Sequence, residues 1–403
     1  MAKPPRITRL KVENYRTLRS LEIDNLSPFT VLVGPNGSGK STFFDVFAFL
    51  SDCFTDGVRR ACDNRGGIAE MRSRGTDGPV TVEITYESLV RLNDRSSRRK
   101  LTYHLSLGED SGRPVVEREL LRWNSSPGPG RPTHVIDFER GAGKIADQES
   151  GIKEERGLSQ PDLLAVSALG QFRNHPRVMA LKDFVSGWYM SYLNVEDERR
   201  TPVAGPQERL SKTGDNLTNV LQYLQENHPE RLEHIIGQLK EAVPGLGEVT
   251  YKSSPDGRLV LLVRDQEFER PVLARYVSDG TLKMLSYLVV LADPDPSPFI
   301  GIEEPENFLY PSLLPGLAAR CRGAAQKSQV LVTTHSTEFV GACQPEEVLA
   351  LYRGQDGYTR VTRPSESETV QSMMESGAQM GWLWESGFFD LPEPTTVASE
   401  YGG

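Results

Sequence analysis

Hydrophobic and polar positions alternate along much of the first half of the chain, which is the period of β-strands. Residues 7–23 predict two strands around Asn14-Tyr15-Arg16, and the apolar run 29–33 predicts a buried third strand. A helix with one broad apolar face is expected after Lys40. Further β-rich runs separated by turn residues predict an antiparallel meander, with strands at 79–86, 101–107, 115–123 and 133–138.

The period becomes helical after these strands. Apolar residues spaced three and four apart predict two short amphipathic helices, one capped by Asp215 and one beginning near Pro229. We therefore expect an inserted helical lobe over residues 161–245, without a long coiled-coil arm. The charged stretch 141–160, with its Gly141-Ala142-Gly143-Lys144 sequence, is expected to be a loop or surface excursion.

The last third of the chain alternates buried strands with helices. A strongly apolar helix is expected after residues 276–281, and buried strands are expected at 299–302 and 329–332. A closing pair of strands is expected at 348–352 and 358–361. This alternation indicates the α/β class, in which ligands bind at the carboxyl ends of the strands.

The segment between the third strand and the first helix fits the phosphate-binding loop pattern G-x-x-x-x-G-K-[ST] at every fixed position. It reads Gly34-Pro35-Asn36-Gly37-Ser38-Gly39-Lys40-Ser41-Thr42. Glycines let the backbone N–H groups wrap around a phosphate, and the new helix adds its positive dipole end. Lys40 is then expected to reach the β- and γ-phosphates of ATP, while the Ser41 hydroxyl coordinates Mg²⁺.

Acidic and polar residues follow two later strands. Glu303 and Glu304 come directly after a buried strand, where one carboxylate is expected near Mg²⁺ and the second is expected to polarise the attacking water. His335 ends the next strand and is either a core histidine or, as its place favours, a γ-phosphate sensor. Ser278 and Gly280 open the apolar helix, either as a cap or as groups offered to a phosphate held by another subunit.

Composition narrows the class of protein. The 403 residues carry a net charge of −9, which argues against a surface coated with nucleic-acid-binding charge. There is no run of 18 apolar residues to span a membrane and no apolar segment after the basic N-terminus, so we expect a cytoplasmic protein. The cysteines lack C-x-x-C spacing and are expected to be buried free thiols; they are Cys53, Cys62, Cys321 and Cys343.

Two local groups of basic residues stand out against this acidic background. One lies in the first twenty residues, where only Glu13 opposes them, and the other lies at 91–100. The second is read as a charged surface turn rather than a nucleic-acid patch, because it interrupts two strand-like segments. The first comprises Lys3, Arg6, Arg9, Lys11, Arg16 and Arg19.

The order of these motifs resembles the ABC-type ATPase head of the RecF, OLD and SMC-like proteins, and most nearly the stand-alone bacterial predicted AAA-family ATPases of that group. The resemblance covers roughly residues 5–363 and includes an Asn-Tyr/Phe-Arg start and a Gly-Asp/Glu-Asn turn. The motifs are 34–42, 277–281, 302–307 and 333–336, with Asn14-Tyr15-Arg16 and Gly214-Asp215-Asn216.

The resemblance implies an α/β fold: a P-loop ATPase head with an antiparallel β subdomain and an inserted helical lobe. The nucleotide-binding lobe is then expected in two parts, residues 1–160 and 246–363, on either side of the helical lobe 161–245. Residues 364–403 form a tail. They leave no room for the C-terminal metal-dependent nuclease domain of OLD-like relatives. The tail's Trp382-Leu383-Trp384 and Phe388-Phe389 are read as a packing anchor in preference to a partner site.

By the same resemblance, two chains close head to head as a homodimer or higher oligomer, with ATP between the phosphate loop of one and the Ser278 segment of the other. Pro305 to Asn307 would cross the interface. The implied catalytic residues are Lys40, Glu304 and His335, and the implied metal-binding residues are Ser41 and Glu303. The implied nucleotide-binding residues are Arg16, Asn36, Gly37, Ser38, Gly39, Lys40, Ser41, Thr42, Ser278 and Gly280.

Three positions depart from the family pattern. Glu303 stands where many relatives have Asp, which changes the metal geometry. Asp279 replaces a glycine of the transporter signature, which argues against a transporter subunit. No glutamine stands at an obvious metal-sensing position, and Gln171 is the candidate for that role.

The leading hypothesis is an ATP-driven dimeric switch read by a separate effector, a nuclease or toxin of a bacterial anti-phage system. The alternative is a repair or recombination ATPase whose N-terminal arginines contact double-stranded DNA. A third hypothesis is a scaffold that binds ATP without hydrolysing it.

Overall fold

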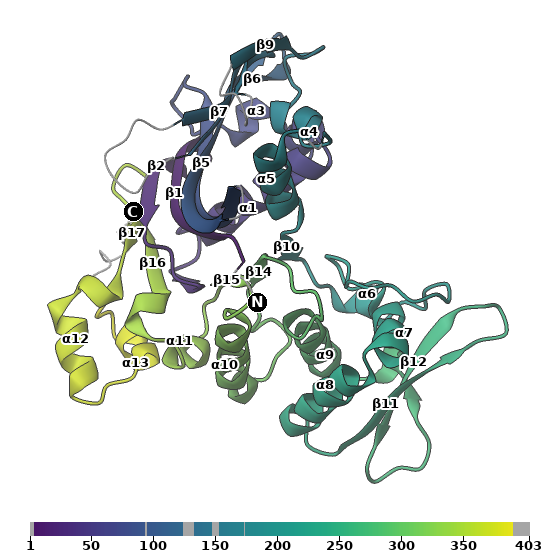
Figure 1. Cartoon of the computed structure of the whole chain (residues 1–403). Helices are drawn as coiled ribbons and strands as arrows, with labels where there is room; N and C mark the ends of the chain where they lie inside the picture. Colours follow the sequence, from purple (N-terminus) through teal and green to yellow (C-terminus); the bar gives the residue numbers. More distant parts are fainter. Residues whose placement is uncertain (1–3, 93–94, 124–132, 147–152, 173, 390–403) are drawn as a thin grey trace, which may run out of the picture.

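Two β-sheets with helices between them form the body of the molecule, and a smaller lobe projects from one side (Figure 1). The computed structural model describes residues 4–92, 95–123, 133–146, 153–172 and 174–389. Buried side chains form two clusters, one on each face of the parallel sheet, and the strand residues alternate between them. Leu32 and Leu331, for example, point to one cluster, while Val31 and Val330 point to the other.

The first sheet has eight strands in the order β2-β1-β4-β5-β6-β7-β8-β9, each antiparallel to its neighbours. Its register pairs buried residues across strands, as in Leu10 with Ile84 and Ile84 with Tyr103. The predicted antiparallel meander is confirmed. The strands are β1 (Arg6–Tyr15), β2 (Leu18–Asp24), β4 (Val80–Leu92), β5 (Arg95–Asp110), β6 (Arg113–Trp123), β7 (Thr133–Glu139), β8 (Ala142–Ala146) and β9 (Lys153–Gly157).

The last two strands correct a prediction, because residues 141–160 are not all loop. Ile145 pairs with Ile136 and is 3% exposed, so β8 gains a buried anchor that its polar neighbours conceal in the sequence. A Cβ added to Gly143 would lie 2.3 Å from Asp137 O, so this glycine permits the close approach of β8 to β7. The Gly141-Ala142-Gly143-Lys144 sequence therefore leads into a strand that lies between β7 and β9; residues 147–152 lie outside the described part of the chain.

The second sheet has six strands in the order β10-β14-β15-β3-β16-β17, and all but the last pair are parallel. Strands β3 and β15 are buried along their whole lengths, as expected for a sheet covered on both faces. The carboxyl ends of β3, β14, β15 and β16 therefore meet at one edge. The strands are β3 (Phe29–Val33), β10 (Tyr189–Ser191), β14 (Phe299–Glu303), β15 (Gln329–Thr333), β16 (Val348–Arg353) and β17 (Thr359–Thr362).

Helices fill the space between the sheets and cover the outer face of the parallel sheet (Figure 1). Helix α1 packs between the sheets, and its Phe47 ring stacks on Phe299 with 4.8 Å between centroids. The inner helices are α1 (Lys40–Thr55), α2 (Val58–Asp63), α3 (Ile68–Met71), α4 (Ala165–Leu169) and α5 (Pro176–Ser186). The outer helices are α9 (Asp279–Leu291), α10 (Leu314–Ala324) and α11 (Thr337–Gly341), with 3-10 turns η1 (Ala274–Tyr276), η2 (Pro311–Leu313) and η3 (Pro345–Glu347).

The projecting lobe contains the two predicted amphipathic helices and a small sheet of three strands. Helix α8 begins at Pro229 as predicted, but the cap of α7 was predicted wrongly, because Asn216 is its N-cap residue and Asp215 instead accepts from Ser211 Oγ at 2.5 Å. The lobe comprises α6 (Val195–Glu198), α7 (Leu217–Asn227), α8 (Pro229–Ala242), β11 (Leu246–Ser253), β12 (Leu259–Asp265) and β13 (Val272–Leu273).

Within the stretch 161–245, α4 and α5 pack with the first hydrophobic cluster, and β10 joins the parallel sheet. Of the strands that follow residue 245, β11 contacts α7 and α8, β12 contacts α7, and β13 pairs with β12. The helical period alone could not show that β10 pairs in parallel with β14, whose residues lie 111 positions later in the sequence. The division of the chain at residues 160 and 245 stays a prediction.

The tail after β17 forms η4 (Pro364–Glu366), α12 (Glu368–Glu375) and α13 (Met380–Glu385). Leu383 and Phe389 are buried, which fits the packing anchor, while Trp382 leaves 52% of its surface exposed. All four cysteines are buried free thiols. Over the residues that the structure describes, none of the helices has the length and apolar character needed to cross a membrane.

Candidate active site

The phosphate loop links β3 to α1 and takes its shape from glycines with positive φ, among them Gly37 at 76° and Gly39 at 107°. Gly39 is the N-cap residue of α1, and a Cβ there would lie 2.2 Å from Thr359 Oγ1. The Thr359 hydroxyl donates to Ser38 O at 2.8 Å, so β17 supports the loop from beside it. The loop conformation therefore depends on glycine and on a contact that the loop sequence does not contain.

A cavity of about 180 Å³ opens beside this loop at the carboxyl edge of the parallel sheet. It brings together the loop, the first residue after β14 and the second residue after β15, which is the convergence that the strand order predicts. Its lining consists of Thr17, Asn36, Gly37, Gly39, Lys40, Ser41, Thr42, Glu304, His335 and Arg353. Among the expected site residues, those outside the lining are Arg16, Ser38, Ser278, Gly280 and Glu303.

Lys40 is 4% exposed, and its ammonium donates to Gly34 O at 2.8 Å and to Pro35 O at 3.1 Å. Burial lowers its pKa to about 8, against the attraction of nearby carboxylates, chiefly that of Glu304. The ammonium is thus held at the loop by carbonyl groups and forms no ion pair with the described residues, so its charge can be matched by a phosphate.

Glu303 and Glu304 differ in their surroundings although they are adjacent. The Glu303 carboxyl hydrogen-bonds with Ser41, and burial raises its pKa above the usual range. Glu304 has a left-handed backbone, with φ 43°, and its N–H donates to Thr333 O at 2.9 Å. Such backbone strain in a residue other than glycine is concentrated at functional sites. It turns the Glu304 side chain into the cavity, where Oε1 lies 3.2 Å from His335 Nε2.

Glu306 is a contact residue that the sequence interpretation did not single out. Its Oε1 accepts from the His335 backbone N–H at 2.5 Å, and its Oε2 accepts from the Thr334 hydroxyl at 2.9 Å. One carboxylate therefore fixes the turn that presents His335. Its position in the sequence could have marked it as a site residue, since Glu306 lies in the same acidic segment as Glu303 and Glu304.

Ser278 is the N-cap of α9, and its hydroxyl contacts Thr281 Oγ1 at 2.7 Å and the Thr281 N–H at 3.3 Å. The cap reading is therefore observed, while the exposed position of Ser278 leaves it accessible to a second molecule. Arg199 of the projecting lobe holds the segment in place, because it donates to Val277 O at 2.8 Å and to Asp279 Oδ1 at 2.5 Å. No local pattern marks Arg199, which lies eighty positions earlier in the sequence.

The segment after the acidic pair also approaches the start of α9. A Cβ added to Gly280 would lie 2.9 Å from Phe308 O, so a larger residue there would push the two segments apart. Phe308 itself has a left-handed backbone, with φ 74°, and is 61% exposed. The acidic segment thus runs from the nucleotide cavity at one end to the Ser278 helix at the other.

The arginine in the cavity lining is Arg353 and not Arg16, which was expected there. Arg16 has φ 49°, and its Nη1 lies 3.1 Å from Asp45 Oδ2. Arg353 lines the cavity instead and donates from Nε to Gly37 O at 2.7 Å. Gln171 lies away from the cavity lining, where its side chain donates to Ser167 O at 3.3 Å. Arg353 ends β16, which becomes a neighbour of the loop only when the sheet forms.

The donors beside the loop fit a magnesium ion. Mg²⁺ prefers one or two protein oxygens together with waters and phosphate oxygens. The Ser41 hydroxyl and the Glu303 carboxylate supply two such oxygens. Across the described ranges, no cluster of three or more His, Cys, Asp and Glu side chains is arranged to hold a metal ion. The arrangement therefore fits an ion that arrives with a nucleotide.

Comparisons with known proteins identify the family of the chain. A family model described as "AAA domain" matches residues 9–242, more than half of the chain. A second, described as "AAA domain, putative AbiEii toxin, Type IV TA system", matches residues 193–341. No curated protein matches the chain.

Two solved structures share the fold. One is an SmcHead bound to the C-winged helix domain of ScpA, with a TM-score of 0.55 and 12% identity, covering 88% of this chain and 97% of that chain. The other is an Smc head domain with an extended coiled coil, bound to the C-terminal domain of ScpA derived from Pyrococcus furiosus. Its TM-score is 0.50 at 12% identity, covering 92% of this chain and 100% of that chain. The predicted α/β head fold is confirmed.

Proposed function

Since the chain belongs to the AAA domain family and has the fold of an SMC-like ATPase head, we propose that it is a magnesium-dependent ATPase. In this proposal two copies close head to head around ATP, and a separate effector protein reads the closed state. The observation that carries the proposal is the meeting of Lys40, Glu304 and His335 in one cavity.

The roles follow from the positions. The loop N–H groups and the start of α1 would bind the phosphates, with the Lys40 ammonium on the β- and γ-phosphates. Ser41 and Glu303 would hold the Mg²⁺, which neutralises charge on the phosphate oxygens when it is bound. Glu304 would orient and polarise the attacking water. His335, 3.2 Å from Glu304, would contact the γ-phosphate and so couple its presence to the base.

Closure of two heads would complete each site, because Ser278 and Gly280 do not line the cavity of their own chain. Exposed aromatic side chains surround this segment and support an interface there, since aromatic residues are enriched in interface centres. They are Tyr276, Phe308 and Tyr310, exposed by 72%, 61% and 73%.

The proposal of a separate effector rests on two comparisons. The family model over residues 193–341 carries a toxin–antitoxin description, and the Smc heads of the same fold were solved with a domain of ScpA, a separate protein. We propose a nuclease or toxin as the effector, in bacterial anti-phage defence. Strong nuclease activity of the purified chain alone would contradict this part.

The decisive experiment measures ATP turnover and solution mass for wild type and Glu304→Gln. We expect the variant to bind ATP, lose turnover and double its mass, because the closed state can no longer reopen. Adding Ser278→Arg to the variant should abolish the mass increase without removing ATP binding. If neither protein hydrolyses ATP or changes mass, the proposal is wrong; unchanged turnover in Glu304→Gln would instead support a scaffold that binds ATP only.

The alternative, a repair ATPase on double-stranded DNA, has less support from the N-terminal basic residues. Arg9 lies 2.7 Å from Glu22 and 2.9 Å from Glu83, and Lys11 lies 2.8 Å from Glu13. Much of the basic charge is therefore compensated within the sheet. Duplex stimulation of the ATPase, with a steep fall in affinity as salt rises, would restore this alternative.

A further inference from the structure

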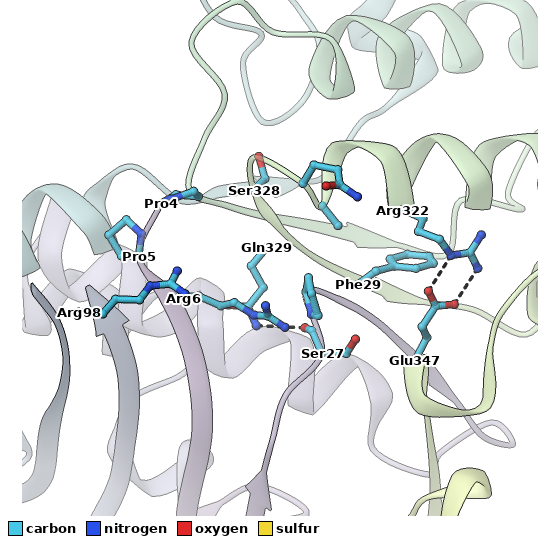
Figure 2. Close-up of a pocket in the computed structure, with 13 residues that line it drawn as sticks. Pro4, Pro5, Arg6, Ser27, Phe29, Arg98, Arg322, Ser328, Gln329 and Glu347 are labelled. Carbon is cyan, nitrogen blue, oxygen red and sulfur yellow. Dashed lines mark hydrogen bonds and ion pairs between the residues drawn. The ribbon is translucent and has the colours of Figure 1, made fainter. Parts of the chain in front are cut away.

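A second cavity, of about 210 Å³, lies at the amino edge of the parallel sheet, away from the nucleotide cavity. It opens where the starts of β1, β3 and β15 meet the end of α10, so both sheets contribute to its wall. Figure 2 shows Arg6 and Arg98 on one flank and the pair of Arg322 with Glu347 on the other. Ser328 lies in the wall between these flanks.

Most acceptors around this cavity already have donors. The Gln329 amide accepts from the Ile7 N–H at 2.8 Å and donates to Ile7 O at 3.0 Å and Ser27 O at 3.3 Å. Glu347 receives Arg322 at 2.6 and 2.7 Å, which neutralises the one carboxylate of the wall. At the end of α10, backbone N–H groups of the following turn occupy the carbonyls of Gly323 and Ala324.

The donors, in contrast, are incompletely used. Among the described residues, none forms a hydrogen bond with the buried Arg6 Nε, and Arg6 Nη2 makes a long contact, 3.5 Å, to Leu26 O. Ser328 is 5% exposed, and its hydroxyl likewise has no partner within the described ranges. Buried polar groups left unpaired are costly, so a pair of them in one cavity wall points to a missing acceptor.

The charges around the cavity also favour an anion. No carboxylate of the described residues lies within ion-pair distance of Arg6, and Arg98 has only Glu87, at 3.9 Å. Burial lowers the pKa of Arg6, as does the nearby Arg98 charge, while Glu87 opposes both. Of the two guanidinium groups, Arg98 is thus the one with a described carboxylate in reach, and that carboxylate, Glu87, also lies 3.8 Å from Lys100.

We propose that this cavity is a binding site for a small anion bearing a carboxylate or phosphate group. Arg6 and Arg98 supply its charge contacts, and the Ser328 hydroxyl donates a hydrogen bond. Guanidinium groups suit this role because their planar N–H donors match the oxygens of both anions. The site lies at the opposite ends of β3 and β15 from the phosphate loop and His335, so its occupant does not compete with ATP.

The test is calorimetric titration of the full chain with inorganic phosphate and, separately, with succinate, at constant ionic strength and without metal. A Lys40→Ala background removes the main charge contact of the phosphate loop. We expect one anion per chain, with affinity reduced about tenfold by Arg6→Gln or Arg98→Gln and less by Ser328→Ala. Arg113→Gln, an exposed position on the same antiparallel sheet, is the matched control and should leave affinity unchanged.

Each outcome of the titration either supports or overturns the proposed anion site. Binding of only one probe would support the site and identify the anion class. The proposal is overturned if neither probe binds, or if Arg98→Gln, an exposed substitution that leaves the core intact, binds both as the background does. Binding that disappears between wild type and Lys40→Ala would assign the anion to the phosphate loop and would equally overturn the proposal. Because ATP turnover is not the readout, failure here is distinct from failure of the ATPase proposal.

Discussion

The two edges of the parallel sheet are built in different ways. At the carboxyl edge, β3, β14 and β15 each run directly into a short motif, and the backbone there takes strained conformations, such as φ 43° at Glu304. At the amino edge, the Gln329 side chain of β15 makes two hydrogen bonds to Ile7 of β1, 322 residues away in sequence, and a third to Ser27 O. The carboxyl edge therefore holds reactive groups at a cost in local stability, while the amino edge joins the two sheets.

The largest expected effect tests the carboxyl edge. Removing the carboxylate in Glu304→Gln should lower kcat by about 10²–10⁴-fold, the usual contribution of a general base. Glu304→Gly should be equally inactive yet more resistant to unfolding, by up to about 1 kcal/mol, because glycine adopts a positive φ without strain. Steady-state turnover and urea unfolding of the two variants check this. A Glu304→Gly variant less stable than Glu304→Gln would show that the backbone there is not strained.

The next prediction tests the amino edge. Gln329 is 4% exposed, and Gln329→Leu would leave Ile7 N–H, Ile7 O and Ser27 O without their partner. We expect a loss of about 2–4 kcal/mol in the free energy of unfolding, with turnover per folded molecule retained. Gln326→Leu, at an exposed position three residues earlier, is the control. If Gln329→Leu lost turnover without losing stability, the amino edge would have a role in catalysis and the two edges would not differ as described.

The same distinction explains how far the sequence could lead. The phosphate loop, Glu304 and His335 were predictable because each motif follows its strand directly, and parallel strands place their carboxyl ends together. Arg199 and Arg353 were not predictable, since they reach the site from elements that become neighbours only after folding. Strand β8 was missed for a similar reason: its large buried side chain, Ile145, finds its partner Ile136 only once β7 lies beside it.

A smaller effect separates two glycines of the phosphate loop. A Cβ at Gly37, with φ 76°, would meet nothing within 4 Å, whereas one at Gly39, with φ 107°, would lie 2.2 Å from Thr359 Oγ1. Gly37→Ala therefore carries backbone strain alone, about 1 kcal/mol, and Gly39→Ala must also displace Thr359 from Ser38 O. We expect Gly39→Ala to weaken binding of a fluorescent ATP analogue about tenfold more than Gly37→Ala. Equal losses would mean that β17 does not support the loop.

The smallest expected effect is the pH dependence of ATP binding. In the nucleotide-free chain, burial lowers the pKa of Lys40 to about 8. Bound phosphates favour the charged ammonium, so ATP raises this pKa, and the protonated chain binds ATP more tightly. Affinity should therefore be full below about pH 7, halve near the pKa of Lys40, and fall by at most tenfold per further pH unit. Lys40→Arg keeps its charge over this range and should bind ATP with little pH dependence. If the affinity of both proteins fell equally with pH, a group other than the Lys40 ammonium would be responsible for the pH dependence.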